Sequence, residues 1–570
     1  MAAPASSRWP RPTVDEVFCL VAGLTLTLLY AWLLDDAYIY FKYVDNWLFL
    51  GRGLVYNPGE YAEGYTSPLW ILLLAALRRL GFGYWTIVRG TGLAAFAAFW
   101  CGCVLVHRRL LAGVPGRGDD SSPGTAAGRI PRVNLPLSLL ALNYGLLSYF
   151  TSGTESPLVA LAAVACALCL IGPTGAIAQV AVGLSPLVRP ELGLVWFLTA
   201  GWLTWRDRRP PWLLLSSGVV ANGGWLLFRA LYYADLFPTT FYLKVRSDPM
   251  QGLLYLHDAF APYYFYAFAL LGLIMLGSAW VVRWELRATT HARTATAAIA
   301  CVMLAYVVLI GGDARHFRYL VFPVCLGALA VGGLPEGWWS ARRRIPKAGI
   351  GILLSLSIAF LSASGTPRQA RRNPLGRLLA GDDSPAVEPQ IVDGIADAEH
   401  HRQHPELPRL SPWGTGAAIE LRGQYEAWRS VGGADPPQLV NAEYLCWFHY
   451  RHFDQWSVHG FGLTDVVLAR SRGEARGDDR PGHRMALLDR ARELAALLPL
   501  RGLPPRAGTY RAAIEAGVAP PWVRANLPVL ELLERKVYGP RDAWESLRLA
   551  THVGERVELD AAPAATPPAR

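Results

Sequence analysis

The chain has 570 residues, and its composition sets it apart from soluble proteins of that length. Apolar residues make up 52% of it and charged residues only 17%, whereas a soluble domain carries about 25% charged residues. The formal charge of +10 lies largely in short loops between apolar blocks, which is typical of the cytoplasmic loops of a membrane protein. No aromatic-interleaved basic groove accompanies these loops, so we expect no nucleic-acid partner.

The first apolar run, from Val17 to Leu34, predicts a retained transmembrane span. No small-residue cleavage site precedes Asp35 and further apolar blocks follow, which argues against a cleaved signal peptide. The block Leu69–Leu77 is too short to cross a bilayer and ends in Arg78 and Arg79. It predicts an interfacial helix.

Hydropathy and loop charge together predict about eleven spans up to residue 364. Two of them are short, and we expect them to be broken or half-helices that line a protein cavity. With the amino terminus inside, the basic loops face the cytoplasm, whereas the acidic loops and the region after the last span face outward. The predicted spans are 17–34, 85–106, 133–150, 156–172, 174–187, 191–205, 211–229, 260–282, 294–311, 317–335 and 347–364.

The sequence therefore predicts a mostly α polytopic membrane module at 1–364, with an outer loop at 35–84 that carries interfacial helices. A soluble α/β or α-rich domain is expected at 365–560 and a disordered tail at 561–570. Probable helices of the soluble domain are Met485–Leu498 and Val529–Val537. Seven of the eight cysteines lie in apolar blocks and Cys446 stands alone, so no disulfide framework is expected in the soluble domain.

Two adjacent carboxylates, Asp35 and Asp36, directly follow the first span. Adjacent carboxylates disfavour each other's ionisation, which raises one pKa toward a value useful for a general base. A pair of acids that merely ends the helix at water is the alternative. The loop behind them is rich in Gly, Pro and Tyr and contains Glu63 and Tyr65, groups suited to binding hydroxyls.

Charged residues recur at the outer ends of at least five predicted spans, which indicates one shared cavity. The motifs are Ser152-Gly-Thr-Glu155, Val188-Arg-Pro-Glu191, Tyr232–Lys244 and Gly311–Arg318. A carboxylate base beside Arg and Lys side chains fits sugar transfer from a lipid-linked phosphate donor, because the cations can hold the departing phosphate. The alternative is a set of helix-end charges that serves topology alone.

The Asp35-Asp36 pair and the loop ending Glu63-Gly-Tyr-Thr-Ser-Pro-Leu-Trp70 resemble the GT-C superfamily of polytopic glycosyltransferases. Within it, the chain is most similar to the actinobacterial arabinofuranosyltransferases that terminate cell-wall arabinan. Gly153-Thr-Glu155, Val188-Arg-Pro-Glu191, Gly311-Gly-Asp313 and the segment from Gly460 to His483 carry the same resemblance. It extends from about residue 30 to 490, over most of the chain.

The resemblance implies an inverting transferase on the outer face of the plasma membrane. The donor would be decaprenyl-phospho-arabinofuranose and the acceptor the non-reducing ends of arabinan in arabinogalactan or lipoarabinomannan. Asp36 or Asp35 would be the base. The residues expected to hold the donor phosphate are Arg189, Lys244, Arg318 and His316. Those expected to bind sugar or acceptor are Glu63, Tyr65, Glu155, Glu191, Asp313, Asp465 and His483.

No cofactor is expected to be required, although a divalent metal is compatible with the acidic residues. His400, His401 and His404 have the spacing of helical metal ligands, but their polar surroundings favour a solvated surface. Two alternative functions remain open at this point. One is transfer of another sugar, such as mannose, from a polyprenyl phosphate. The other is transport of lipid-linked sugars, which would place the ionisable residues near the bilayer midplane and often shows inverted repeats.

Overall fold

The computed structural model describes two parts of the chain. The amino-terminal part covers 12–112 (without 30 and 32) and 135–332 (without 173–174, 245–247, 261–264, 283–286 and 314–316). The carboxy-terminal part covers 441–443, 446, 457–472, 486–497, 508–539 and 542–558. The described chain is mostly helical, as the sequence predicts.

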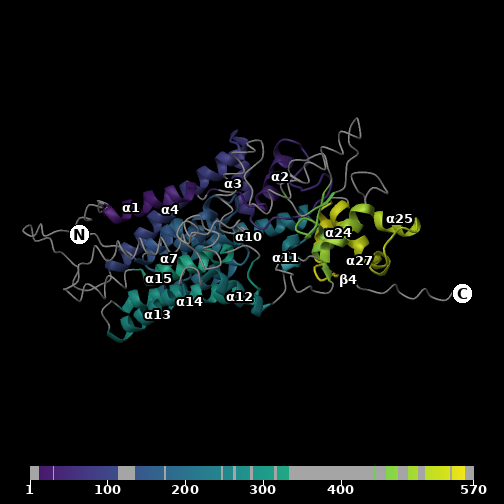
Figure 1. Ribbon diagram of the computed structural model, residues 1–570. Coiled ribbons are helices and arrows are strands. Elements are labelled where there is room, and N and C mark those ends of the chain that lie inside the picture. The colour runs from purple at the N-terminus through teal and green to yellow at the C-terminus, as the bar shows by residue number, and fades with distance from the viewer. Residues whose placement is uncertain are drawn as a thin grey trace, which may run out of the picture.

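Long apolar helices form a bundle in the amino-terminal part, and α1, α4, α7, α13, α14 and α15 lie side by side in it (Figure 1). Among the described residues, three helices are long and apolar enough to cross a membrane: Tyr84–Leu110, Trp212–Tyr232 and Thr289–Leu309. The bundle helices are α1 Val14–Leu29, α4 Tyr84–Ala112, α5 Leu135–Leu142, α6 Tyr144–Leu147, α7 Ser156–Leu170, α8 Ala176–Leu184, α9 Leu192–Asp207, α10 Trp212–Tyr232, α13 Phe265–Val282, α14 Arg287–Leu309 and α15 Val321–Val331.

The span predicted at 133–150 is wrong as a single helix. The chain there forms α5, α6 and a 3-10 turn, and then bends by 119° into α7. Gly153 lies at the bend with φ +78°, and a Cβ on it would come within 2.7 Å of the Ala37 Cβ. Only glycine combines that backbone with so close an approach. The bend places Glu155 at the start of α7, and the span predicted at 347–364 lies outside the described residues.

The loop between the first two bundle helices contains two short helices, α2 Ala37–Leu48 and α3 Pro68–Arg79. The Ser67 side chain accepts the Trp70 amide and Pro68 occupies the first turn, both of which favour a helix start. At about 1.5 Å per residue α3 is only about 18 Å long. The predicted helix is thus confirmed, and its place at the membrane interface stays a prediction.

The carboxy-terminal part consists of short helices and two parallel strand pairs, β1–β2 and β3–β4. It packs on the outer loop: a single hydrophobic cluster contains Tyr43 and Trp70 from the loop together with Leu463 and Trp522. The helices predicted near 485–498 and 529–537 are confirmed. The elements are β1 Asn441–Glu443, β2 Ser457–His459, α23 Val466–Ala469, β3 Ser471–Arg472, α24 Ala486–Leu497, α25 Thr509–Glu515, α26 Pro521–Ala525, α27 Leu527–Tyr538, α28 Ala543–Ala550 and β4 Val557–Glu558.

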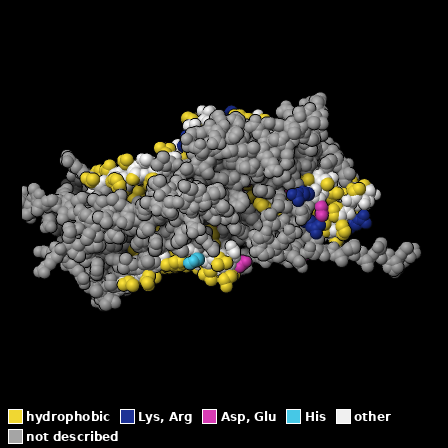
Figure 2. All heavy atoms as spheres, viewed as in Figure 1, with side chains coloured by type: hydrophobic (Ala, Val, Ile, Leu, Met, Phe, Trp, Pro, Cys, Tyr) yellow, Lys and Arg dark blue, Asp and Glu magenta, His cyan; other side chains and the backbone are white. Residues whose placement is uncertain are grey.

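Surface chemistry differs between the two ends of the molecule. Helices α24, α25 and α27 lie beyond α11 Thr239–Lys244, at the end opposite the body of the bundle (Figure 1). On the face in Figure 2, described Lys, Arg and acidic side chains gather over that end, whereas those over the bundle are mainly hydrophobic. Exposed apolar side chains such as Val21 on α1, Val220 on α10 and Ile274 on α13 suit contact with lipid.

Candidate functional site

The adjacent carboxylates of Asp35 and Asp36 have different partners. Asp36 forms an ion pair with Arg318, its Oδ2 lying 2.6 Å from Nη1. Asp35 accepts a hydrogen bond from the main-chain amide of Cys446, at 3.2 Å from Oδ2. Asp36 therefore contacts the bundle, and Asp35 contacts the carboxy-terminal part. Asp35 is 8% exposed, and the Asp36 side chain is 19% exposed.

Arg318 is the centre of a buried cluster of charges, which we call the Arg318 cluster. Its guanidinium lies 3.6 Å from Glu155 Oε1 and 3.8 Å from Asp313 Oδ2, in addition to Asp36. Glu155 also accepts the Tyr40 hydroxyl at 3.1 Å. Three segments far apart in the sequence thus meet at one point: the start of α2, the bend before α7, and the connection between α14 and α15, which carries both Asp313 and Arg318.

Arg189 extends this cluster. Its Nε lies 2.6 Å from Glu191 Oε1 and its Nη1 lies 3.7 Å from Glu155 Oε1. The guanidinium also stacks over the Tyr319 ring, 3.9 Å from the centroid. With its four carboxylates and two guanidinium groups ionised, the cluster has a net charge of −2 (2 − 4). The structure therefore brings these predicted residues together, whereas the cavity that they were expected to line and its place on the outer face stay predictions.

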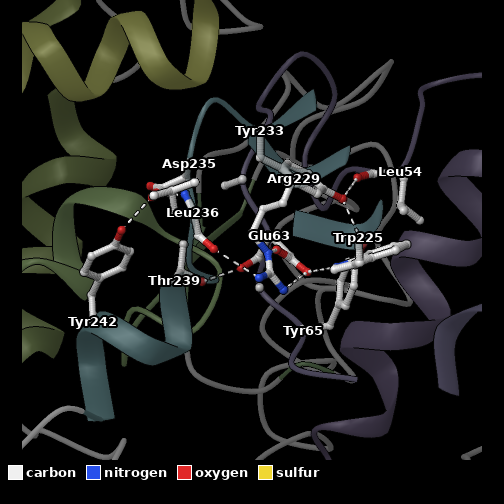
Figure 3. Close-up of polar contacts among 12 residues, drawn as sticks. Leu54, Glu63, Tyr65, Trp225, Arg229, Tyr233, Asp235, Leu236, Thr239 and Tyr242 are labelled. Atoms are coloured by element: carbon white, nitrogen blue, oxygen red, sulfur yellow. Dashed lines mark hydrogen bonds and ion pairs between the residues drawn. The ribbon is translucent and has the colours of Figure 1, made fainter. Parts of the chain in front are cut away.

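Glu63 belongs to a second, separate network, shown in Figure 3. Its carboxylate is paired with Arg229 of α10, and Oε1 also accepts the Trp225 indole N–H at 3.3 Å. Burial raises the pKa of Glu63, and the Arg229 charge opposes that shift. Tyr65 lies beside this pair, with its hydroxyl 3.1 Å from that of Tyr233.

A third network joins the bundle to the carboxy-terminal part. Asp235 is paired with Arg470, whose guanidinium stacks on the Tyr242 ring, 3.6 Å from its centroid. Lys536 lies 3.6 Å from the same carboxylate, and the Tyr242 hydroxyl donates to it at 2.5 Å. Arg470 is fully buried, so this network fixes the carboxy-terminal part against α11 and the end of α10.

Asp465 lies at a cavity rather than in the Arg318 cluster. The cavity is also lined by Glu60, Glu534, Tyr510 and Tyr538, and it is large enough for a water molecule. Burial raises the pKa of Asp465 to about 6 and raises that of Glu60 well above its usual value, and Asp465 adds to the Glu60 shift. Two carboxyl groups that disfavour each other's charge thus face each other across the junction of the two parts.

Lys42 is a buried cation that the sequence analysis did not select as a site residue. It is 0% exposed and its Nζ lies 4.2 Å from the centre of the Tyr56 ring. Burial lowers its pKa to about 7, and Glu60 opposes that shift. Arg229 and Tyr40 were also missed. A charged residue within an apolar helix is a signal that would have found Arg229.

The remaining predicted residues lie elsewhere or outside the described chain. His316 and His483 are outside the described residues, and so are His400, His401 and His404. Lys244 ends α11, but its side chain also lies outside the described part. Within the described residues, no group of three or more His, Cys, Asp and Glu side chains is arranged to hold a metal ion.

Two curated proteins are similar to this chain. A terminal β-(1→2)-arabinofuranosyltransferase of Corynebacterium glutamicum is 28% identical over 370 residues, which cover 56% of this chain and 51% of that protein. A terminal β-(1→2)-arabinofuranosyltransferase of Mycobacterium tuberculosis is 28% identical over 462 residues, which cover 70% of each chain. The chain thus spans about half the length of the first relative. No family model matches it, and no solved structure matches it. The chain is a distant relative of the terminal β-(1→2)-arabinofuranosyltransferases.

Proposed function

We propose that the protein is a membrane glycosyltransferase that adds arabinofuranose to the non-reducing ends of cell-wall arabinan. The donor in this proposal is decaprenyl-phospho-arabinofuranose, and the reaction takes place on the outer face of the plasma membrane. The names of the two relatives support the arabinose assignment. The observation that carries the chemistry is Asp36, a carboxylate 2.6 Å from a buried arginine that is itself surrounded by further charges.

The reaction follows from these groups. A carboxylate takes the proton of an acceptor hydroxyl while the hydroxyl oxygen attacks the anomeric carbon. The bond from that carbon to the phosphate oxygen breaks, and its electron pair leaves with the polyprenyl phosphate. Arg318 and Arg189 stabilise the charge of the departing phosphate through charge-assisted hydrogen bonds. Attack from the face opposite the leaving group inverts the anomeric centre.

The Asp36–Arg318 pair suits Asp36 to act as the base only when the donor is bound. In the free protein Asp36 is paired with the guanidinium of Arg318. A donor phosphate at Arg318 competes with Asp36 for that guanidinium, which frees the carboxylate to take the proton of the acceptor hydroxyl. For Asp35 the contact described above is with the main-chain amide of Cys446, whereas for Asp36 it is with a cation. The proposal therefore assigns the base role to Asp36 and keeps Asp35 as the alternative.

The deciding experiment is transfer of radiolabelled arabinose from decaprenyl-phospho-arabinose to a synthetic arabinan oligomer by purified protein. Wild type, Asp35→Asn and Asp36→Asn are compared, with Asp207→Asn as the control because that carboxylate is 48% exposed in a surface pair. We expect product from wild type and the control, and a loss of about 10²–10⁴-fold in the base variant.

Two other outcomes would overturn parts of the proposal. Product from a polyprenyl-phospho-mannose but not from the arabinose donor would retain the transferase and reject arabinose. No transfer from any lipid-linked donor by folded protein would reject the transferase and favour a transporter of lipid-linked sugars.

A further inference from the structure

A strand pair of the carboxy-terminal part is linked through Cys446 to Asp35, one of the two candidate carboxylates. β1 and β2 run parallel, with Asn441 opposite Ser457 and Glu443 opposite His459. Ser457 is fixed to the outer loop by two reciprocal hydrogen bonds with Asn57: the amide of Ser457 donates to Oδ1 at 3.1 Å, and Nδ2 donates to the Ser457 carbonyl at 2.8 Å. The position of β2 relative to the loop is thereby set.

Cys446 follows β1 by three residues and connects this strand pair to Asp35. Its main-chain amide donates to Asp35 Oδ2 at 3.2 Å, and its Sγ lies 3.1 Å from His459 Nε2. Cys446 and His459 are each 1% exposed. A chain of polar contacts thus runs from β2 through the imidazole and the cysteine to the carboxylate.

The contacts of His459 decide which of its nitrogens carries the proton. Nδ1 accepts the main-chain amide of Phe461 at 3.3 Å, so it has no proton. In the neutral imidazole the proton is then on Nε2, which points at the sulfur. In this tautomer His459 donates to the sulfur of Cys446 rather than accepting its proton. This arrangement suits holding Cys446 in place rather than activating it as a nucleophile.

We propose that Cys446 and His459 are positioning residues for Asp35: the amide of Cys446 orients the carboxylate, and His459 holds Cys446 in that place. The inference deepens the proposed function and rests on it for the role of Asp35 in transfer. It also gives the carboxy-terminal part a role in the reaction, because that part supplies the amide that contacts Asp35. The positioning acts through the main chain, so the identity of the side chain at 446 matters only through its contact with His459.

Two substitutions at one position separate positioning from bulk stability. In His459→Gln the amide nitrogen occupies the place of Nε2 and still reaches the sulfur. In His459→Asn the amide keeps the contact with Phe461 but is too short to reach Cys446. We expect His459→Asn to lower kcat about tenfold or more with the donor KM within about twofold, because Asp35 adjoins the proposed base Asp36 at the start of α2 and a small misplacement of the reacting carboxylate is costly. His459→Gln should recover most of the kcat.

A second measurement tests the contact without any sugar. Amide hydrogen exchange is followed for the peptide that contains Cys446, in full-length protein in nanodiscs. Asp35→Ala removes the acceptor and should speed exchange of the Cys446 amide, whereas Asp35→Asn keeps an acceptor oxygen and should leave it slow. Unchanged exchange in Asp35→Ala would overturn the inference.

The two readouts keep failure of the inference apart from failure of the proposed function. Equal loss of kcat and of melting temperature in both His459 variants would show a purely structural role and reject the positioning role. Wild-type protein that transfers no arabinose rejects the proposed function. In that case the exchange of the Cys446 amide alone decides whether the carboxy-terminal part holds Asp35.

Discussion

Replacing Arg318 by methionine tests whether the Arg318 cluster is ionised and held together by this side chain. Methionine replaces the aliphatic stem of arginine and has no charge, so the change removes the counter-charge of Asp36 at 2.6 Å, Glu155 at 3.6 Å and Asp313 at 3.8 Å. Arg318 is 7% exposed, which leaves little water to compensate. The net charge of the cluster falls from −2 to −3 (−2 − 1).

Removing one partner of a buried ion pair costs about 3–5 kcal/mol, because the other charge stays buried without compensation. At roughly 2 °C per kcal/mol for a chain of this size, the melting temperature should fall by roughly 6–10 °C. The assay is thermal unfolding in detergent at neutral pH. Arg511→Met is the control: its pair with Glu531 is similarly close at 2.6 Å, but that guanidinium is 59% exposed. It should cost less than about 1 kcal/mol.

A double variant checks the cause. Adding Asp313→Asn to Arg318→Met removes one of the negative charges, so the double variant should melt higher than Arg318→Met alone. If Arg318→Met melts as high as Arg511→Met, the carboxyl groups around Arg318 are protonated and the ionised cluster is refuted. If the double variant melts lower than Arg318→Met, charge repulsion is not the source of the loss.

Three further predictions concern the other networks. Burial raises the pKa of Glu60 and raises the pKa of Asp465 to about 6. The stability of the junction should therefore fall as the pH rises through these raised pKa values, because ionisation then costs free energy in the folded protein. Glu60→Gln should raise the melting temperature at pH 8 and change it little at pH 4. Asp235→Asn leaves the fully buried Arg470 with less counter-charge, and should cost about 3 kcal/mol and speed proteolysis of the carboxy-terminal part; unaltered proteolysis would contradict this. Glu63→Gln weakens the pair with Arg229 and should lower kcat/KM about tenfold, with Glu531→Gln, a surface carboxylate, unaffected.

The sequence allowed the Arg318 cluster to be predicted because helix ends carry a strong signal. Charged residues next to apolar blocks are costly unless they pair, and a consistent topology places Asp36, Glu155 and Arg318 on the same side. The number of residues between them along the chain then matters little for predicting that they lie together. What could not be predicted was which carboxylate meets which cation, since Arg318 contacts residues 282, 163 and 5 positions away (318 − 36, 318 − 155, 318 − 313).

The contacts between the two parts of the chain left no such signal. Asp35 and Cys446 are 411 positions apart, and a hydrogen bond to a main-chain amide requires no particular residue type there. The break inside 133–150 was missed, because these residues are apolar enough for one span, yet α5 ends at Leu142 and α6 begins at Tyr144. The turn before α7 falls between two predicted spans, but its sharpness depends on Gly153 fitting against Ala37, which is a tertiary contact.

The different partners of the two aspartates imply different roles for them, which neither residue type nor spacing reveals. Asp36 is paired with Arg318, so its surroundings depend on what else that guanidinium binds. Asp35 faces a main-chain amide whose position depends on β2 and on Asn57 of the outer loop. A ligand that moves the carboxy-terminal part must therefore act on Asp35 first, whereas a phosphate at Arg318 must act on Asp36 first. Because the two residues are adjacent at the start of α2, the contacts to the bundle and the contacts to the carboxy-terminal part meet within one peptide unit.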